Sequence, residues 1–147
     1  MGTTTIPVYG ATIEWSDDGS TFAAIPKCKA IVIPEVTQDY REVTNLDSVN
    51  GFREYVPSLK DGGELTLEAL YSKELYDAAV TKRDAGTLVT VKVTLPVDTD
   101  QDTGDEFEWT AYVNPSIPQG EIDGDVMINL NFRTSGDVSW TEGTASA

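Results

Sequence analysis

The fold class is decided by a stretch with a period of two, Ile122-Asp123-Gly124-Asp125-Val126-Met127-Ile128-Asn129-Leu130-Asn131-Phe132. Its even positions are mostly apolar, and the odd positions between them are mostly polar. Successive side chains of a strand point to opposite faces of a sheet, so this alternation predicts a strand with one buried face.

The same alternation recurs along the chain. It predicts strands over 107–113, 89–95, 65–71 and 9–15, and a further strand or bent pair over 29–43 that Pro34 interrupts. Asp17-Asp18-Gly19-Ser20 reads as a hairpin turn after the first of these strands.

One segment has helical spacing instead. Leu75, Ala78 and Ala79 form an apolar stripe. Ser72 is suited to cap the helix start, and Gly86 to follow its end. The sequence therefore predicts a mainly β protein, an antiparallel β-sandwich or barrel with one flanking helix and a long loop between strands.

The length fits a single domain over 1–147, since domains cluster at roughly 100–150 residues. Within it we expect an N-terminal arm over 1–8, a long loop over 46–63, an acidic connection over 97–105 and a flexible tail over 135–147. The long loop carries Val49, Phe52, Tyr55, Val56 and Leu59, too many apolar groups for a fully solvated segment. We expect these side chains to need a partner, and the loop to become ordered only against one.

Composition narrows the function. The net charge of −15 argues against a surface that grips nucleic acid or anionic lipid. Without histidine the chain has no imidazole-based catalytic dyad or triad and no imidazole metal site. The single cysteine, Cys28, excludes an internal disulfide, and we interpret it as a small buried hydrophobe. No apolar run reaches the roughly 20 residues of a membrane-spanning helix.

Three features of the sequence suggest other chemistries. The acidic loop 98–106 resembles a calcium loop, but its glycine falls at loop position 7 and Trp109 stands at position 12, so a solvated connection is favoured. A glycosidase pair of carboxylates cannot be located, and no nucleophile or base is indicated, so we expect no enzyme activity and no cofactor or metal. Trp15 and Trp109 fall on apolar strand faces, which leaves Trp140 as the tryptophan placed to meet a partner.

A family resemblance lies in the long loop and the strand after it. Val43-Thr44-Asn45-Leu46-Asp47-Ser48 leads through Gly51-Phe52-Arg53-Glu54-Tyr55-Val56-Pro57-Ser58-Leu59-Lys60-Asp61-Gly62-Gly63-Glu64 into Leu65-Thr66-Leu67. This segment, and the order of elements over roughly 9–136, resembles the major tail tube protein of long-tailed bacteriophages, the lambda-like type, and its relatives in gene transfer agents. Ser58 stands where the family pattern suggests glycine.

The resemblance implies a structural virion protein. Six copies would form a ring, rings would stack into a tube around a tape-measure protein, and tail-tip and tail-terminator proteins would close its ends. The tube would conduct the genome into the host without binding it, after assembly in the host cytoplasm. The resemblance assigns contacts between subunits to a set of loop residues: Asn45, Leu46, Asp47, Ser48, Phe52, Arg53, Tyr55, Val56 and Leu59.

The charge is unevenly distributed. Residues 97–147 hold 11 acidic side chains and one basic side chain, Arg133. In a ring, such residues would be repeated around the channel, where they would repel DNA phosphates. We therefore predict that some of them face the lumen, with Glu106, Glu108, Asp123 and Asp125 as candidates. The alternative function is a monomeric β-sandwich module on a virion or cell surface that binds calcium or a glycan.

Overall fold

The computed structural model describes residues 6–97 and 102–144. The start of the predicted N-terminal arm, Asp98 and Asp100 of the acidic connection, and the last three residues lie outside the described residues. The elements of the described part are β1 (Thr12–Ser16), β2 (Ala23–Ala24), β3 (Thr37–Glu42), the 3-10 turn η1 (Val49–Gly51), β4 (Tyr55–Asp61), β5 (Glu64–Leu70), α1 (Lys73–Ala85), β6 (Val89–Thr94), β7 (Glu106–Ser116) and β8 (Met127–Thr141). The predicted mainly β, antiparallel fold with one helix is confirmed.

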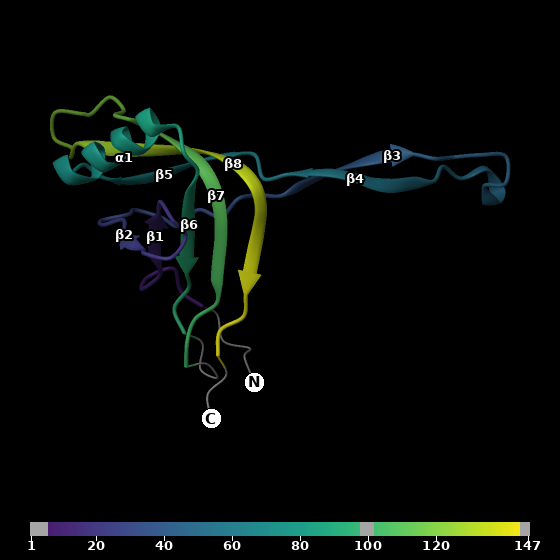
Figure 1. Ribbon diagram of the computed structural model, residues 1–147, viewed down its shortest axis with the longest axis horizontal. Helices are drawn as coiled ribbons and strands as arrows, with labels where there is room; N and C mark the ends of the chain where they lie inside the picture. The colour runs from purple at the N-terminus through teal and green to yellow at the C-terminus, as the bar shows by residue number, and fades with distance from the viewer. Residues whose placement is uncertain (1–5, 98–101, 145–147) are drawn as a thin grey trace.

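Six strands form one antiparallel sheet in the order β2-β1-β6-β7-β8-β5. The long strands β7 and β8 bend along their length, so that the sheet curls (Figure 1). One side of this sheet carries the core, and its largest fully buried side chains are Trp109, Phe132, Leu67, Ile128, Leu130, Val89, Val91 and Val93. The predicted alternation of β5, β6 and β7 is thus confirmed in both position and face.

Helix α1 closes the core side of the sheet, against β7. Its start is capped as predicted, because the Ser72 side chain accepts a hydrogen bond from the Leu75 N–H at 3.2 Å. Gly86 ends it in the left-handed conformation (φ 68°). Leu75 and Ala79 are buried in the core, and burial of a leucine contributes roughly 1.5–3 kcal/mol.

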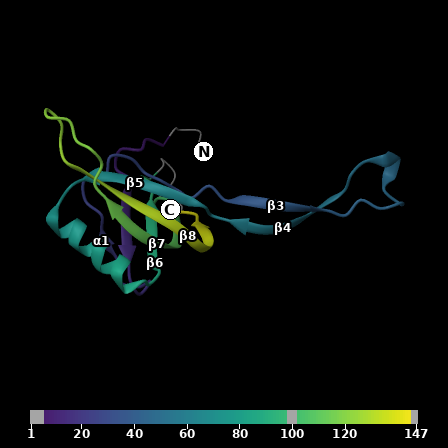
Figure 2. The same cartoon turned by 90° about the horizontal axis from the view of Figure 1, so that it is seen from above.

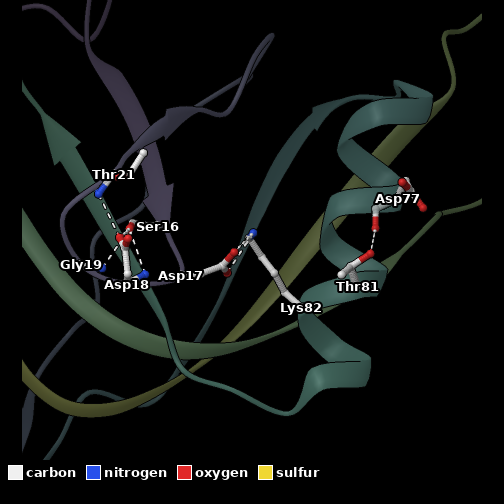
Figure 3. A network of polar contacts seen from close by, with 8 residues as sticks. All are labelled: Ser16, Asp17, Asp18, Gly19, Thr21, Asp77, Thr81 and Lys82. Carbon is white, nitrogen blue, oxygen red and sulfur yellow. Dashed lines mark hydrogen bonds and ion pairs between the residues drawn. The ribbon is translucent and has the colours of Figure 1, made fainter.

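The turn after β1 is tied to the helix (Figure 3). Lys82 on α1 forms an ion pair with Asp17 (3.0 Å) and lies 4.8 Å from the ring centre of Trp15. Within the turn, Asp18 accepts hydrogen bonds from the N–H groups of Ser20 and Thr21, each at 2.9 Å. The predicted hairpin turn is therefore confirmed.

Two predicted boundaries are wrong. The expected loop over 46–63 contains a strand, because β4 (Tyr55–Asp61) pairs with β3. Likewise the expected flexible tail from Ser135 is strand as far as Thr141. A break in the alternation hid each of them: Pro57 interrupts the pattern in β4, and a bulge around Gly136 (φ 100°) interrupts it in β8.

The first residues of two predicted strands lie in loops. Ile122 is fully exposed, and β8 begins only at Met127, because the Glu121–Gly124 segment forms a turn closed by the Gly124 N–H bond to the Glu121 carbonyl (3.0 Å). Tyr9 is also exposed, and β1 begins at Thr12 after a similar turn at Val8–Ala11.

Candidate assembly surfaces

The second sheet, β3-β4, projects away from the rest of the molecule. With its connecting tip (residues 43–54) it forms an extended hairpin, residues 37–61, that leaves the six-stranded sheet on the side opposite α1 in both views (Figures 1 and 2). None of residues 35–61, all of which the structure describes, is buried. The hairpin therefore contributes nothing to the core of its own chain.

Two tyrosines and a proline gather on one face of the hairpin. Tyr40 stands opposite Pro57 in the register, and Tyr55 lies two residues from Pro57 on the same face. The two tyrosines are 63% and 53% exposed and together line a shallow apolar depression. Leu59, further along β4, is 78% exposed. Exposed apolar side chains gathered in this way are typical of an interaction site in soluble proteins.

The tip is held by its own hydrogen bonds. The N–H of Val43 donates to the Glu54 carbonyl (2.8 Å), and the N–H of Glu54 donates to the Thr44 hydroxyl (2.9 Å). At its far end, the Asn45 N–H donates to Ser48 Oγ at 3.0 Å. These local turns give the tip a defined backbone within one chain, and the expectation that the segment becomes ordered only against a partner stays a prediction.

The structure brings the predicted contact residues together on the hairpin. Asn45, Asp47 and Ser48 form the turn at its end, where Leu46 is fully exposed and Phe52 is 71% exposed. On its strands, Val56 is half-buried. Arg53 lies 3.8 Å from Glu42, an exposed and therefore weak pair. Tyr40 is not among the residues predicted from the sequence. Strand β3 has no alternation of apolar and polar residues that would single out Tyr40 as a contact residue.

A second surface is the polar face of the six-stranded sheet, the face turned away from the core. Glu14, Lys92, Glu108 and Ser139 stand side by side in one row across β1, β6, β7 and β8. Thr12, Thr94, Glu106 and Thr141 form the next row. Glu106 and Glu108 are half-buried on this face. Their only basic neighbour in these two rows is Lys92, which also lies 4.2 Å from the ring centre of Phe22.

The polar face continues over β5, β8 and β7 as a ladder of uncharged groups. The Thr66 hydroxyl donates to Asn131 Oδ1 (2.9 Å), and the Asn131 amide donates to the Asn114 carbonyl and to Ser116 Oγ (both 3.1 Å). Arg133 lies beside this ladder, between Glu64 and Tyr112. The whole polar face thus combines carboxylates with hydrogen-bonded neutral side chains.

The structure separates the four candidate lumen residues into two pairs. Glu106 and Glu108 lie on the polar face, whereas Asp123 and Asp125 lie exposed in the loop between β7 and β8. That loop is attached near α1, because the Tyr71 N–H donates to the Val126 carbonyl at 3.0 Å. One flat surface cannot carry all four.

The three tryptophans differ as expected. Trp15 and Trp109 are buried (5% and 1% exposed), whereas Trp140 is 57% exposed, opposite Phe107 near the end of β8. Cys28 is half-buried against the core, and its burial raises the pKa of the thiol to about 11.

Two features are absent from the described residues: a cluster of metal ligands and a helix of membrane-spanning length. Residues 6–97 and 102–144 contain no group of three or more acidic or cysteine side chains arranged to hold a metal ion. The candidate calcium loop 98–106 begins outside these residues. Among the same residues no helix has the length and hydropathy needed to cross a membrane.

Comparison with known proteins gives a fold but no family. No protein-family model and no curated protein sequence matches the chain. Several solved structures share its fold, among them one baseplate chain and two tail chains. A chain of the six-fold symmetrised cryo-EM baseplate of the anti-feeding prophage superposes with a TM-score of 0.68, covering 97% of this chain and 98% of that one at 12% identity.

The other two structures are tails. A chain from the tail of an empty GTA particle, refined with C6 symmetry, superposes with a TM-score of 0.66, covering 88% of this chain and 94% of that one at 19% identity. A chain of the SPP1 tail tube superposes with a TM-score of 0.63, covering 94% and 81% at 16% identity. The chain therefore has, over nearly its full length, the fold found in these tail and baseplate proteins.

Proposed function

We propose that the protein is the subunit of a phage-type tail tube: it assembles into hexameric rings, the rings stack into a hollow tube, and the tube conducts DNA. The observation that carries this proposal is the projecting hairpin, whose exposed apolar side chains are not covered by any described part of its own chain. The fold it shares with a chain of a six-fold symmetrised baseplate, a chain of a tail with C6 symmetry and a chain of a tail tube supports it.

The hairpin calls for a partner on energetic grounds. A two-stranded hairpin alone in water is marginally stable, and Phe52, Tyr55 and Leu59 each leave more than half of their surface in water. The proposed partner is a second copy of the chain. The hairpin of one subunit would contact the sheet of the next, so the two contacting surfaces would differ. Such head-to-tail contacts generate closed rings or helical stacks.

The charge of the chain suits a conduit. A net charge of −15 repels nucleic acid, so the genome would pass without the release of counterions that accompanies tight binding. Of the candidate acidic residues, we propose that Glu106 and Glu108 face the lumen, because they lie on the polar face of the sheet. In such a tail the further partners would be a tape-measure protein inside the tube and tail-tip and tail-terminator proteins at its ends.

Electron microscopy of the purified protein over a range of concentrations tests the proposal. We expect rings of six and hollow tubes. Uniform monomers at the highest attainable concentration would contradict it and favour the monomeric binding module instead.

A double variant tests the role of the hairpin. Phe52→Ala with Tyr55→Ala removes two exposed rings that contribute nothing to the core, so the chain should keep its melting temperature but lose rings and tubes. The matched control is Tyr71→Ala, which removes a 40% exposed ring beside α1 and should assemble normally. Tubes of normal length and yield from the double variant would remove the hairpin from the interface.

A further inference from the structure

We propose that the junction between the hairpin and β8, made of Asp61, Gly62 and Gly63 on one side and Arg133 and Thr134 on the other, sets the direction of the hairpin and thereby the angle at which copies join. The direction of the hairpin is a property of one chain. Its consequence for joining rests on the proposed function.

Gly62 allows the base of the hairpin to lie directly on β8. Gly62 is buried, and so is Thr134, which is 5% exposed. A Cβ added at Gly62 would lie 2.9 Å from the Thr134 Cβ and 2.5 Å from its Cγ2. Distances below 3.0 Å are not found for real Cβ atoms, so any side chain at 62 must push the hairpin base and β8 apart.

Three polar contacts fix the junction on either side of Gly62. The Thr134 N–H donates to the Gly63 carbonyl (2.9 Å), and the Gly63 N–H donates to Asp61 Oδ1 (3.0 Å). Arg133 Nη2 lies 3.4 Å from Asp61 Oδ2, and the pKa of Asp61 is held below its usual value by the Gly63 N–H and by the Arg133 charge. Gly63 itself has φ of 70°, which favours glycine there.

The β8 side of the junction is itself held in place. The register between β7 and β8 shifts at the bulge, so that Thr134 stands opposite Ala111 and Val138 opposite Trp109. Within the bulge, the Thr110 hydroxyl donates to the Ser135 carbonyl. The next residue, Gly136, has a φ of 100°. Thr134 is therefore attached to the core through β7 and cannot follow the hairpin if the hairpin moves.

Hydrophobic packing does not hold the β4 side of the hairpin base. A small cavity separates the hairpin base from the bulge, lined by Val36 and Lys60 on one side and by Asp137 and Val138 on the other. No residue from 35 to 61 is buried. On the β3 side the chain enters the hairpin through Ile31 and Val32, which pack against the core, and through the buried Pro34. On the β4 side, where no core residue spans the base, the contacts of the junction hold the hairpin against β8.

The hairpin amplifies any change at its base. At about 3.4 Å per residue, Tyr55 lies roughly 20 Å from Asp61, so a rotation of about 10° at the junction displaces Tyr55 by roughly 3.5 Å. Side chains in close-packed interfaces do not tolerate shifts of that size. A loosened junction should therefore impair joining without touching the contact residues themselves.

Spin-label distances measure the direction of the hairpin. Labels at Glu54→Cys, on the outer end of the hairpin, and Lys73→Cys, at the exposed start of α1, are placed in a Cys28→Ala background. A tenfold excess of unlabelled protein keeps the measured distances within one chain. We expect one narrow distance in the parent and a shifted or broader distribution in Gly62→Ala. Gly120→Ala is the matched control, since its Cβ would meet only the Asp125 carbonyl oxygen at 4.0 Å, and should leave the distribution unchanged.

A second variant covers the case in which Gly62→Ala does not fold. Arg133→Gln removes the exposed partner of Asp61 and should broaden the distribution, and Arg133→Lys should restore it in part. Tube formation, measured by electron microscopy, should fall in both loosened variants and not in Gly120→Ala. An unchanged distance distribution in both loosened variants would overturn the proposal. If the distances change and the parent forms no tubes, the proposed function fails while the role of the junction in setting the hairpin direction stands.

Discussion

Asp18 is a single carboxylate that stabilises the fold only while it is ionised. The N–H groups of Thr21 and Ser20 and the Ser16 hydroxyl all donate to it, and together they hold its pKa far below the usual value. A lowered folded-state pKa means that this stabilisation is fully present above about pH 4, where the unfolded chain is also ionised, and is lost as the pH falls further.

Asp18→Asn tests this dependence, because it keeps an acceptor oxygen but removes the charge. Its unfolding midpoint in urea should lie below that of the parent at pH 7. The difference between the two midpoints should become smaller as the pH falls below about 4. Asp47→Asn, on the exposed tip, is the control and should track the parent at every pH. A gap that stays constant down to pH 2 would show that the charge of Asp18 is not involved.

Two tryptophans of the same strand pair differ in exposure because they lie at different positions along the sheet. Trp109 and Trp140 both lie on the long β7-β8 pair, yet the first is fully buried and the second is largely exposed. The difference follows from position along the sheet, because Trp109 belongs to the core cluster that α1 joins through Leu75 and Ala79, whereas Trp140, near the end of β8, lies outside it. Exposure, and not residue type, therefore decides which aromatic side chains are available to a partner.

At the scale of elements, α1 offers a direct stability test. Ser72→Ala removes the side-chain acceptor for the Leu75 N–H and should lower the free energy of unfolding by about 1 kcal/mol, the usual cost of losing such a cap. Urea denaturation measures it, with the m-value unchanged. Ser58→Ala, on the exposed strand β4, should stay within about 0.5 kcal/mol of the parent. An equal loss in both variants would contradict a specific capping role.

The elements that sequence predicts well are those whose alternation is unbroken. In β5, β6 and β7 apolar and polar residues alternate, and the caps Ser72 and Gly86 mark both ends of α1. In β4, Pro57 and the bulge opposite Asp39 disturb the pattern, and the apolar side chains face solvent, so the segment looks like a loop. In β8 the bulge at 135–137 separates two stretches that both pair with β7. From the sequence, the first stretch is predicted as a strand and the second as a tail.

The assembly surfaces were predictable only in part, for a related reason. Apolar residues without a core to enter, such as Phe52 and Leu59, are visible in the sequence, and their exposure is confirmed. The junction is not visible, because Gly62 and Thr134 are far apart in the chain and only the pairing of β5 with β8 brings them together. Likewise the residues next to Glu108 and Asp123 in the sequence do not show that the first lies on a sheet face and the second in a loop.

At the scale of the whole molecule, the four candidate lumen carboxylates are divided between two places. Glu106 and Glu108 stand on the polar face of the sheet, and Asp123 and Asp125 stand in the loop between β7 and β8. If the polar face lines the lumen, a ring repeats the first pair around a confined channel, where their potential adds. The second pair, on a loop attached near α1, would then serve solubility alone.

This division gives a matched comparison in assembled tails. Glu106→Lys with Glu108→Lys and Asp123→Lys with Asp125→Lys each reverse two charges, so the two double variants differ only in place. The first should assemble but slow genome ejection at low salt, because lysines facing the channel would bind phosphates and release counterions. Its defect should ease as salt rises, since screening weakens the attraction. The second should eject at the rate of the parent at every salt concentration. The ejection rate is measured by the fluorescence of an external dye that binds the ejected DNA. Slow ejection by the second variant together with a normal rate in the first would place the lumen at the loop between β7 and β8 and not at the polar face of the sheet.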